Sequence, residues 1–208
     1  MIVCYHREIL KPWTDIELQE RLSFLPDNIQ KPILLKRNHL DVQLSVSGNL
    51  LLLELIKHFG LDLKLSNLIY GEHKRPYFNN DFDFNISHSG NRVICCATKE
   101  GKVGIDIELM QPVSINYDDY FTPTEQANIR AAQNPEAEFF RYWTKKEALL
   151  KAVGTGMFTP LLDIDVSEDE VQYRNGIYYL SPIDIDEDYL GCIAHTFRQD
   201  ILIKELIL

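Results

Sequence analysis

Two acidic residues, Asp106 and Glu108, are separated by one position in the apolar segment 103–108. On a β-strand, side chains at i and i+2 share a face, so the two carboxylates project together. Gly104 shares that face and leaves room for a close approach to the backbone. Neighbouring carboxylates repel one another unless a cation or a shared proton intervenes, and a hard divalent ion such as Mg²⁺ prefers oxygen ligands of this kind. The alternative for this segment alone is an edge strand with a solvated acidic face.

Trp143, Glu147 and Lys151 recur at intervals of four residues in a segment with a helical pattern. This spacing places the three side chains on one face of a helix, one above another. A glutamate four residues before a lysine is also a common surface pair, which is the structural alternative. The aromatic residue on the same stripe indicates a partly buried face, where a carboxylate and an ammonium group need partners.

Two further segments carry groups that suit an anion. Residues 84–90 (FNISHSG) place Ser87 and His88 at the end of an apolar strand, where their donors could contact an anionic oxygen. Upstream, Arg75 precedes Pro76, which sets a cation beside a rigid turn. The structural alternatives are a capped histidine at a strand end and a solvated basic loop.

Local signals predict the elements that must position these residues. Capping boxes at Thr14 and Thr122 each open a helix, and Gly154 follows the last residue of the helical pattern that begins at Asn134. Helices are expected at residues 14–25, 41–59, from 122 onward, and 134–153. Strands are expected at 2–5, 61–65, 82–86, 92–98, 103–109, 164–166, 176–180, 189–197 and 201–206, with a hairpin at 99–102. Because helices and strands segregate more than they alternate, the sequence predicts a mixed α+β protein.

Composition limits the possible partners and compartment. The 208 residues, 45% hydrophobic and 25% charged, suit one large domain or two small lobes. The net charge of −10 excludes a whole-protein cationic footprint, so we expect neither nucleic acid nor membrane as a partner. Four cysteines without a C-x-x-C motif, and a start unlike a secretory signal, favour a cytoplasmic protein.

Together these segments resemble the 4′-phosphopantetheinyl transferase superfamily, specifically its two-lobed type that activates surfactin synthetase. The resemblance covers about residues 71–156, and its blocks occur in the family's order. The matching blocks are Arg75-Pro76, residues 84–90, residues 103–108, Phe121 with Glu125, and the pattern WxxKExxxKxxGxG from Trp143 to Gly156. The resemblance implies an α+β pseudo-dimer of two similar lobes that acts as a monomer. We expect an N-terminal lobe at 1–101 on the coenzyme A side and a C-terminal lobe at 102–208 with the metal and the catalytic helix.

The family's chemistry implies a holo-[acyl-carrier-protein] synthase. It would move 4′-phosphopantetheine from coenzyme A to a serine of an apo acyl or peptidyl carrier protein, with Mg²⁺, and release 3′,5′-ADP. By resemblance, the metal ligands are Asp106, Glu108 and Glu147. Glu147 is also the expected general base, directly or through a bound water, and Lys151 the residue that eases departure of the leaving group. The expected coenzyme-binding residues are Arg75, Pro76, Ser87, His88, Lys146, Lys151, Arg37 and Ser45.

The N-terminal region departs from the family pattern. The basic-aromatic stretch that usually reaches the 3′-phosphate is replaced by residues 31–48, from which Arg37 and Ser45 come. Two alternatives therefore stay open, a Mg²⁺-dependent phosphohydrolase of nucleotide diphosphates and an inactive coenzyme A-binding or carrier-binding module. Because carrier proteins of this class are acidic, we expect Arg130, Arg141 and Lys145 to form a basic docking face.

Overall fold

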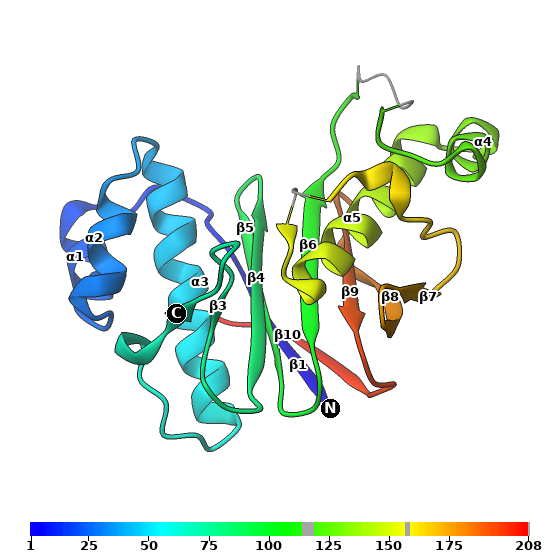
Figure 1. Ribbon diagram of the computed structural model, residues 1–208. Helices are drawn as coiled ribbons and strands as arrows, with labels where there is room; N and C mark the ends of the chain where they lie inside the picture. Colours follow the sequence, from blue (N-terminus) through cyan, green and yellow to red (C-terminus); the bar gives the residue numbers. More distant parts are fainter. Residues whose placement is uncertain (114–118, 157–158, 208) are drawn as a thin grey trace. The chain divides into compact units, whose positions relative to one another are not determined.

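The computed structural model describes residues 1–113, 119–156 and 159–207 and shows a mixed α+β protein, as predicted (Figure 1). The chain forms two compact units, one of residues 1–99 with 200–208 and the other of residues 100–199. The predicted division after residue 101 lies close to this one, but residues 200–208 were expected in the C-terminal lobe. They belong to the first unit because strand β10 (Ile201–Glu205) pairs in parallel with β1 (Ile2–Glu8). No helix of the described segments is long and apolar enough to cross a membrane.

The first unit is built on a four-stranded sheet in the order β10-β1-β5-β4. Its long helix α3 (His39–His58) packs on β5 and β1. Buried apolar side chains of α3 and of the sheet form one hydrophobic cluster, which fixes the helix on that face. The remaining elements of this unit are α1 (Asp15–Leu22), α2 (Asp27–Leu34), β2 (Ile69–Tyr70), β3 (Pro76–Tyr77), β4 (Asp83–Ser89) and β5 (Arg92–Thr98).

The second unit is built on a four-stranded sheet in the order β6-β9-β8-β7. Its long helix α5 (Pro135–Val153) packs on β6 and β9, as Figure 1 shows, and a second hydrophobic cluster lies beneath it. The remaining elements are α4 (Pro123–Ala131), β6 (Val103–Leu109), β7 (Glu170–Tyr173), β8 (Gly176–Asp186) and β9 (Tyr189–His195).

The two units connect their main elements in the same order along the chain. In the first, β1 leads through helices to α3 and then to the antiparallel hairpin β4–β5, whose second strand pairs antiparallel with β1. In the second, β6 leads through α4 to α5 and then to the hairpin β8–β9, whose second strand pairs antiparallel with β6. Each unit therefore places one long helix over its first strand.

The local signals for helix ends are confirmed. Both expected capping boxes form, at Thr14 and at Thr122. The side chain of Asn134 accepts a hydrogen bond from the backbone N–H of Ala137, and α5 ends at Gly154, whose φ of 85° is left-handed. Helix α5 therefore has the predicted bounds.

Several non-local expectations were wrong. Residues 99–102 do not form a hairpin, because β5 already has β1 and β4 on its two edges and β6 pairs with β9. Residues 61–65 are not a strand, since Leu65 begins a short 3₁₀ helix, and residues 164–166 follow another such turn. Helix α2 and strand β7 were not predicted.

Candidate active site

Helix α5 approaches strand β6 closely at Gly104. A Cβ atom at this position would lie 2.2 Å from the carbonyl oxygen of Ala148 and 2.3 Å from the amide nitrogen of Ala152. Both are backbone atoms, so the contact requires glycine. The expected room beside Gly104 is therefore filled by the backbone of α5, which brings the last turns of the helix against the strand.

The acidic face of β6 meets a lysine of α5 at this contact. Asp106 shares its strand face with Gly104 and Glu108, as expected for alternate residues. The Nζ of Lys151 lies 2.5 Å from Oδ1 of Asp106, and the two side chains are 25% and 4% exposed. This is a charge-assisted hydrogen bond in a partly dry environment, which is stronger than an exposed ion pair.

Glu147 belongs to the same charged group. Burial raises the pKa of its carboxyl group, and the negative charges of Asp106 and Glu108 raise it further, while Lys151 opposes them. Like charges within reach of one another have this effect because ionising one disfavours ionising the next. The structure therefore brings Asp106, Glu108, Glu147 and Lys151 into one electrostatic cluster within the second unit.

The donor set of this cluster suits a hard cation in its chemistry. Carboxylate oxygens are the ligands that Mg²⁺ prefers, and crowded negative charge favours a divalent ion. Among the residues that the structure describes, however, no three His, Cys, Asp or Glu side chains lie close enough together, as they stand, to hold a metal ion. Lys151 provides a positive charge directly beside Asp106.

An aromatic hollow of about 450 Å³ lies beside Glu108. Its walls include Phe139, Phe140 and Trp143, and the rings of Phe139 and Trp143 stack at 6.0 Å with an interplanar angle of 11°. Trp143 is half-buried, as its place on the stripe with Glu147 predicted. The two phenylalanines were not singled out from the sequence, although Phe139 stands four residues before Trp143 on the same helix face.

Lys146, which was expected to bind the coenzyme, is bonded in this structure to groups of the protein itself. Its side chain and that of Glu125 are both 0% exposed, and Nζ lies 2.7 Å from Oε2 of Glu125. Its other hydrogen bonds go to the carbonyl oxygens of Leu161 (2.8 Å) and Ile164 (2.6 Å). Three acceptors use all three N–H groups of the ammonium, so none remains for a phosphate. Burial lowers the pKa of Lys146, and Glu125 opposes that change.

Glu125 connects this buried ion pair to the start of α4. Its Oε2 accepts a hydrogen bond from the backbone N–H of Thr122, and its Oε1 accepts one from the backbone N–H of Val166. The capping box of α4, helix α5 and the segment after η4 (Leu161–Asp163) are therefore tied together by one carboxylate and one ammonium group.

Apart from Lys151, the other expected coenzyme-binding residues lie in the first unit, where Arg75 is already paired. Its guanidinium donates to both carboxylate oxygens of Asp83 at 2.9 and 2.8 Å, a bidentate ion pair that joins the turn before β3 to β4. Pro76 begins β3 directly after it. The edge of the guanidinium facing Asp83 is therefore not available to a phosphate.

Ser87 and His88 lie within a strand and not beyond its end. Strand β4 continues to Ser89, and the turn to β5 is made at Gly90, whose φ is 54°. Adjacent residues of a strand point to opposite faces, so the buried Ser87 and the exposed His88 cannot contact the same group.

Arg37 and Ser45 both belong to the region of α3. Arg37 is exposed just before the helix begins. The hydroxyl of Ser45 donates to the backbone carbonyl of Asp41 at 2.6 Å, which leaves its lone pairs to accept other bonds. The structure thus places these two residues near one end of α3 and assigns neither a ligand.

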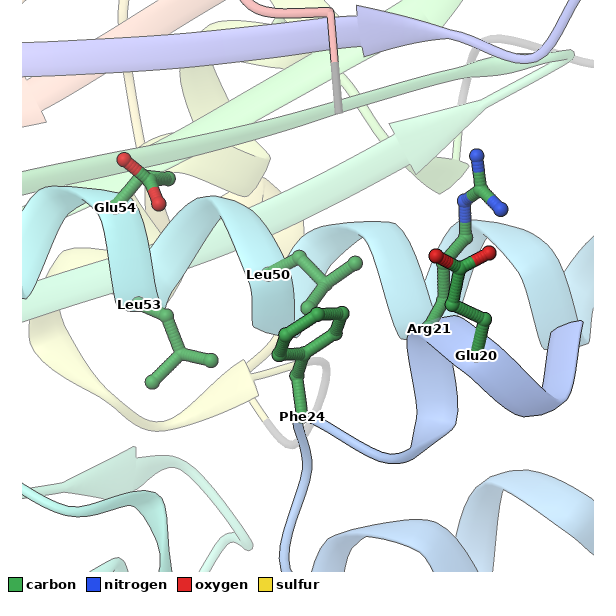
Figure 2. Close-up of a pocket in the computed structure, with 6 residues that line it drawn as sticks. All are labelled: Glu20, Arg21, Phe24, Leu50, Leu53 and Glu54. Carbon is green, nitrogen blue, oxygen red and sulfur yellow. The ribbon is translucent and has the colours of Figure 1, made fainter. Parts of the chain in front are cut away.

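A second hollow, of about 280 Å³, lies between α1 and α3 in the first unit (Figure 2). Figure 2 shows Phe24 beside Leu50, with Glu20 and Arg21 of α1 toward one end and Leu53 and Glu54 of α3 toward the other. Its floor is apolar, and it includes none of the residues predicted to do chemistry. We therefore place the candidate active site at the contact of β6 and α5.

This contact has the groups that phosphate transfer requires, namely carboxylates to hold a cation or a proton and an ammonium group to offset phosphate charge. Comparison with known proteins agrees. The model of the 4′-phosphopantetheinyl transferase superfamily matches residues 102–193, which include β6, α5 and the whole charged cluster.

Individual relatives extend the similarity beyond that segment. A 4′-phosphopantetheinyl transferase of Bacillus subtilis is 33% identical over 154 residues, which cover 67% of this chain and 68% of the relative. The 4′-phosphopantetheinyl transferase gsp of Aneurinibacillus migulanus is 31% identical over 159 residues, covering 72% and 66% of the two chains. The 4′-phosphopantetheinyl transferase AcpT of Salmonella typhi is 37% identical over 99 residues, covering 43% and 50%. The chain belongs to the 4′-phosphopantetheinyl transferase superfamily.

Proposed function

We propose that this protein transfers the 4′-phosphopantetheine group of coenzyme A to a serine of an apo acyl or peptidyl carrier protein. The observation that carries the proposal is the cluster of Asp106, Glu108, Glu147 and Lys151, which lies within the segment matched by the family model. The protein is proposed to act as a cytoplasmic monomer, with no nucleic acid or membrane as a partner.

Asp106, Glu108 and Glu147 are proposed to hold Mg²⁺. When bound, this ion supplies positive charge against the diphosphate of the coenzyme. The support comes from the electrostatic interaction of all three carboxylates and from their hard oxygen donors.

In the chemical step, Glu147 and Lys151 of α5 have different roles. The serine oxygen of the carrier forms a bond to the phosphorus that bears pantetheine, while the bond from that phosphorus to the bridging oxygen breaks. The 3′,5′-ADP leaves with the electron pair, and the serine proton passes to Glu147. A carboxylate whose pKa is raised by burial and by Asp106 is a better proton acceptor than an exposed glutamate. Lys151, at the end of the helix, offsets charge on the departing oxygen.

The residues of the first unit are proposed to bind the rest of the coenzyme. Because the edge of Arg75 is bonded to Asp83, its contact with adenine would use the flat face of the guanidinium, together with Pro76. Ser87 and His88 would contact different groups, since they lie on opposite faces of β4. The proposed contacts with the 3′-phosphate side are Arg37 and Ser45.

The proposed docking face for the acidic carrier consists of Arg130 and Arg141, without Lys145. Arg130 lies on α4, and Arg141 on α5 is more than half exposed. Lys145 is only 14% exposed, and its Nζ lies 2.8 Å from Asp169, so it is withdrawn from the docking face. Charge reversal at Arg130 and Arg141 should raise KM for the carrier more than KM for coenzyme A, and equal effects would contradict this assignment.

Mass spectrometry of carrier proteins tests the activity directly. The protein is incubated with Mg²⁺, coenzyme A and a panel of apo acyl and peptidyl carriers, beside a transferase known to modify that panel. We expect one phosphopantetheine group per modified carrier and one 3′,5′-ADP released for each. Release of 3′,5′-ADP without a carrier would instead indicate a phosphohydrolase, and binding without product an inactive module.

A further inference from the structure

The ion pair with Lys151 occupies the carboxylate of Asp106, which the proposed metal site also needs. Nζ of Lys151 lies 2.5 Å from Oδ1 of Asp106, and the Asp106 side chain is almost fully buried. A carboxylate oxygen that ligates Mg²⁺ lies about 2.0–2.1 Å from the ion. An ammonium group and a divalent ion on one oxygen would repel each other strongly in a site shielded from water.

The charges of the cluster allow Lys151 two alternative partners, the carboxylate of Asp106 and a bound diphosphate. Asp106, Glu108 and Glu147 are acidic, and Lys151 is the cation whose charge acts on Glu147. A diphosphate brings further negative charge to the same place, and its oxygens accept hydrogen bonds from an ammonium group as well as a carboxylate does. Lys151 stands in the last turn of α5, two residues before Val153 at the end of the helix, and its long side chain is one-quarter exposed.

We infer that Lys151 competes with the divalent cation for Asp106 and that the diphosphate of the substrate removes this competition. With Lys151 on Asp106, the carboxylates attract a cation weakly. When a diphosphate binds, the ammonium group moves to it and Asp106 becomes available to the cation. Cation and coenzyme then favour each other's binding, and the coupling is reciprocal. This inference rests on the proposed function for the identity of the diphosphate.

The test measures Mn²⁺ binding by electron paramagnetic resonance of the free ion, without any carrier or turnover. We compare wild type with Lys151→Met and with Lys145→Met as a matched control. The control removes the same charge from the same helix, but Lys145 pairs with Asp169 and Lys151 with Asp106. In the absence of coenzyme A, we expect Lys151→Met to bind Mn²⁺ at least about fivefold more tightly than wild type. Lys145→Met should match wild type.

The coenzyme supplies the second arm of the experiment. Adding coenzyme A should tighten Mn²⁺ binding to wild type beyond the affinity of Mn²⁺ for coenzyme A alone, and by a smaller factor in Lys151→Met. Equal Mn²⁺ affinity of wild type and Lys151→Met without coenzyme would overturn the inference, whatever the transfer assay shows. Wild type that binds no Mn²⁺ even with coenzyme would instead overturn the metal assignment in the proposed function.

Discussion

The middle turn and the last turn of helix α5 each contain a lysine paired with a carboxylate, yet the two pairs differ in surroundings. Lys146 and Glu125 are completely buried, and the remaining N–H groups of the lysine bond to backbone carbonyls. Lys151 is one-quarter exposed, and its partner Asp106 belongs to a strand face with a second acid. The saturated pair holds the helix in place, whereas the partly open pair is able to exchange partners, which is what a binding site needs.

The largest effect is expected on activity from Asp106→Asn. The substitution keeps the shape of the side chain but removes the charge shared by the proposed metal site and by Lys151. We expect the transfer rate to fall at least about 100-fold, with the midpoint of urea denaturation close to that of wild type. Rates by mass spectrometry and unfolding by circular dichroism check both parts, and a wild-type rate would contradict the assignment.

The largest effect on stability is expected from Lys146→Met, because it leaves the carboxylate of Glu125 buried without its ammonium partner. The expected loss in free energy of unfolding is about 3–5 kcal/mol. Adding Glu125→Gln should recover part of that loss, since the amide oxygen still accepts from backbone N–H groups. The matched control Lys145→Met should lose about 1 kcal/mol or less, because Asp169 is 70% exposed. Equal losses at the two lysines would remove the distinction between the two turns.

Helix α5 also shows how much of the structure could be predicted from the sequence. The bounds of α5 and the shared face of Asp106 and Glu108 depend on local signals, namely caps and strand alternation, and they were predicted. The burial of Lys146 depends on which face of α5 packs against α4 and the segment around η4. That face was visible in the buried neighbours Tyr142, Leu149 and Leu150, three or four positions away, but the lysine was read as a phosphate ligand.

The pairing of strands was the other feature that could not be predicted from the sequence. A short turn-like segment such as residues 99–102 looks the same whether it joins two paired strands or two separate units, because its neighbours in space are set by distant parts of the chain. The same reason explains the return of β10 to the first unit. The strand face of β6 and the stripe of α5 were each predictable, but their meeting at Gly104 was visible only as unexplained room.

Gly104→Ala tests that meeting. Its methyl group would overlap backbone atoms of Ala148 and Ala152, so α5 must shift on β6. We expect a stability loss of about 1–3 kcal/mol and, because the shift moves Glu147 and Lys151 from Asp106, a fall in transfer rate of about 100-fold. Gly71→Ala is the control, since its nearest neighbour lies 3.7 Å away. An unchanged rate in Gly104→Ala would show that the close approach has no role in catalysis.

The smallest effect is expected in the pH dependence of stability, measured without divalent ions. The pKa of Glu147 is raised in the folded protein, so the folded state binds this proton more tightly than the unfolded chain. The resulting stabilisation is complete below the unfolded pKa of about 4.3 and is lost as pH rises through the raised pKa. Glu147→Gln should therefore be more stable than wild type at neutral pH and approach it in acid. Lower stability of Glu147→Gln at neutral pH would contradict the raised pKa.

The most direct test of the account compares phosphopantetheine transfer per folded molecule in Lys151→Met and Lys146→Met, at a temperature where both variants are folded. We predict that Lys151→Met loses at least about 100-fold in rate with a smaller loss of stability than Lys146→Met, and that Lys146→Met keeps its rate within about tenfold. The reverse order of rates would place the chemistry at the buried lysine and contradict the assignment of the two turns.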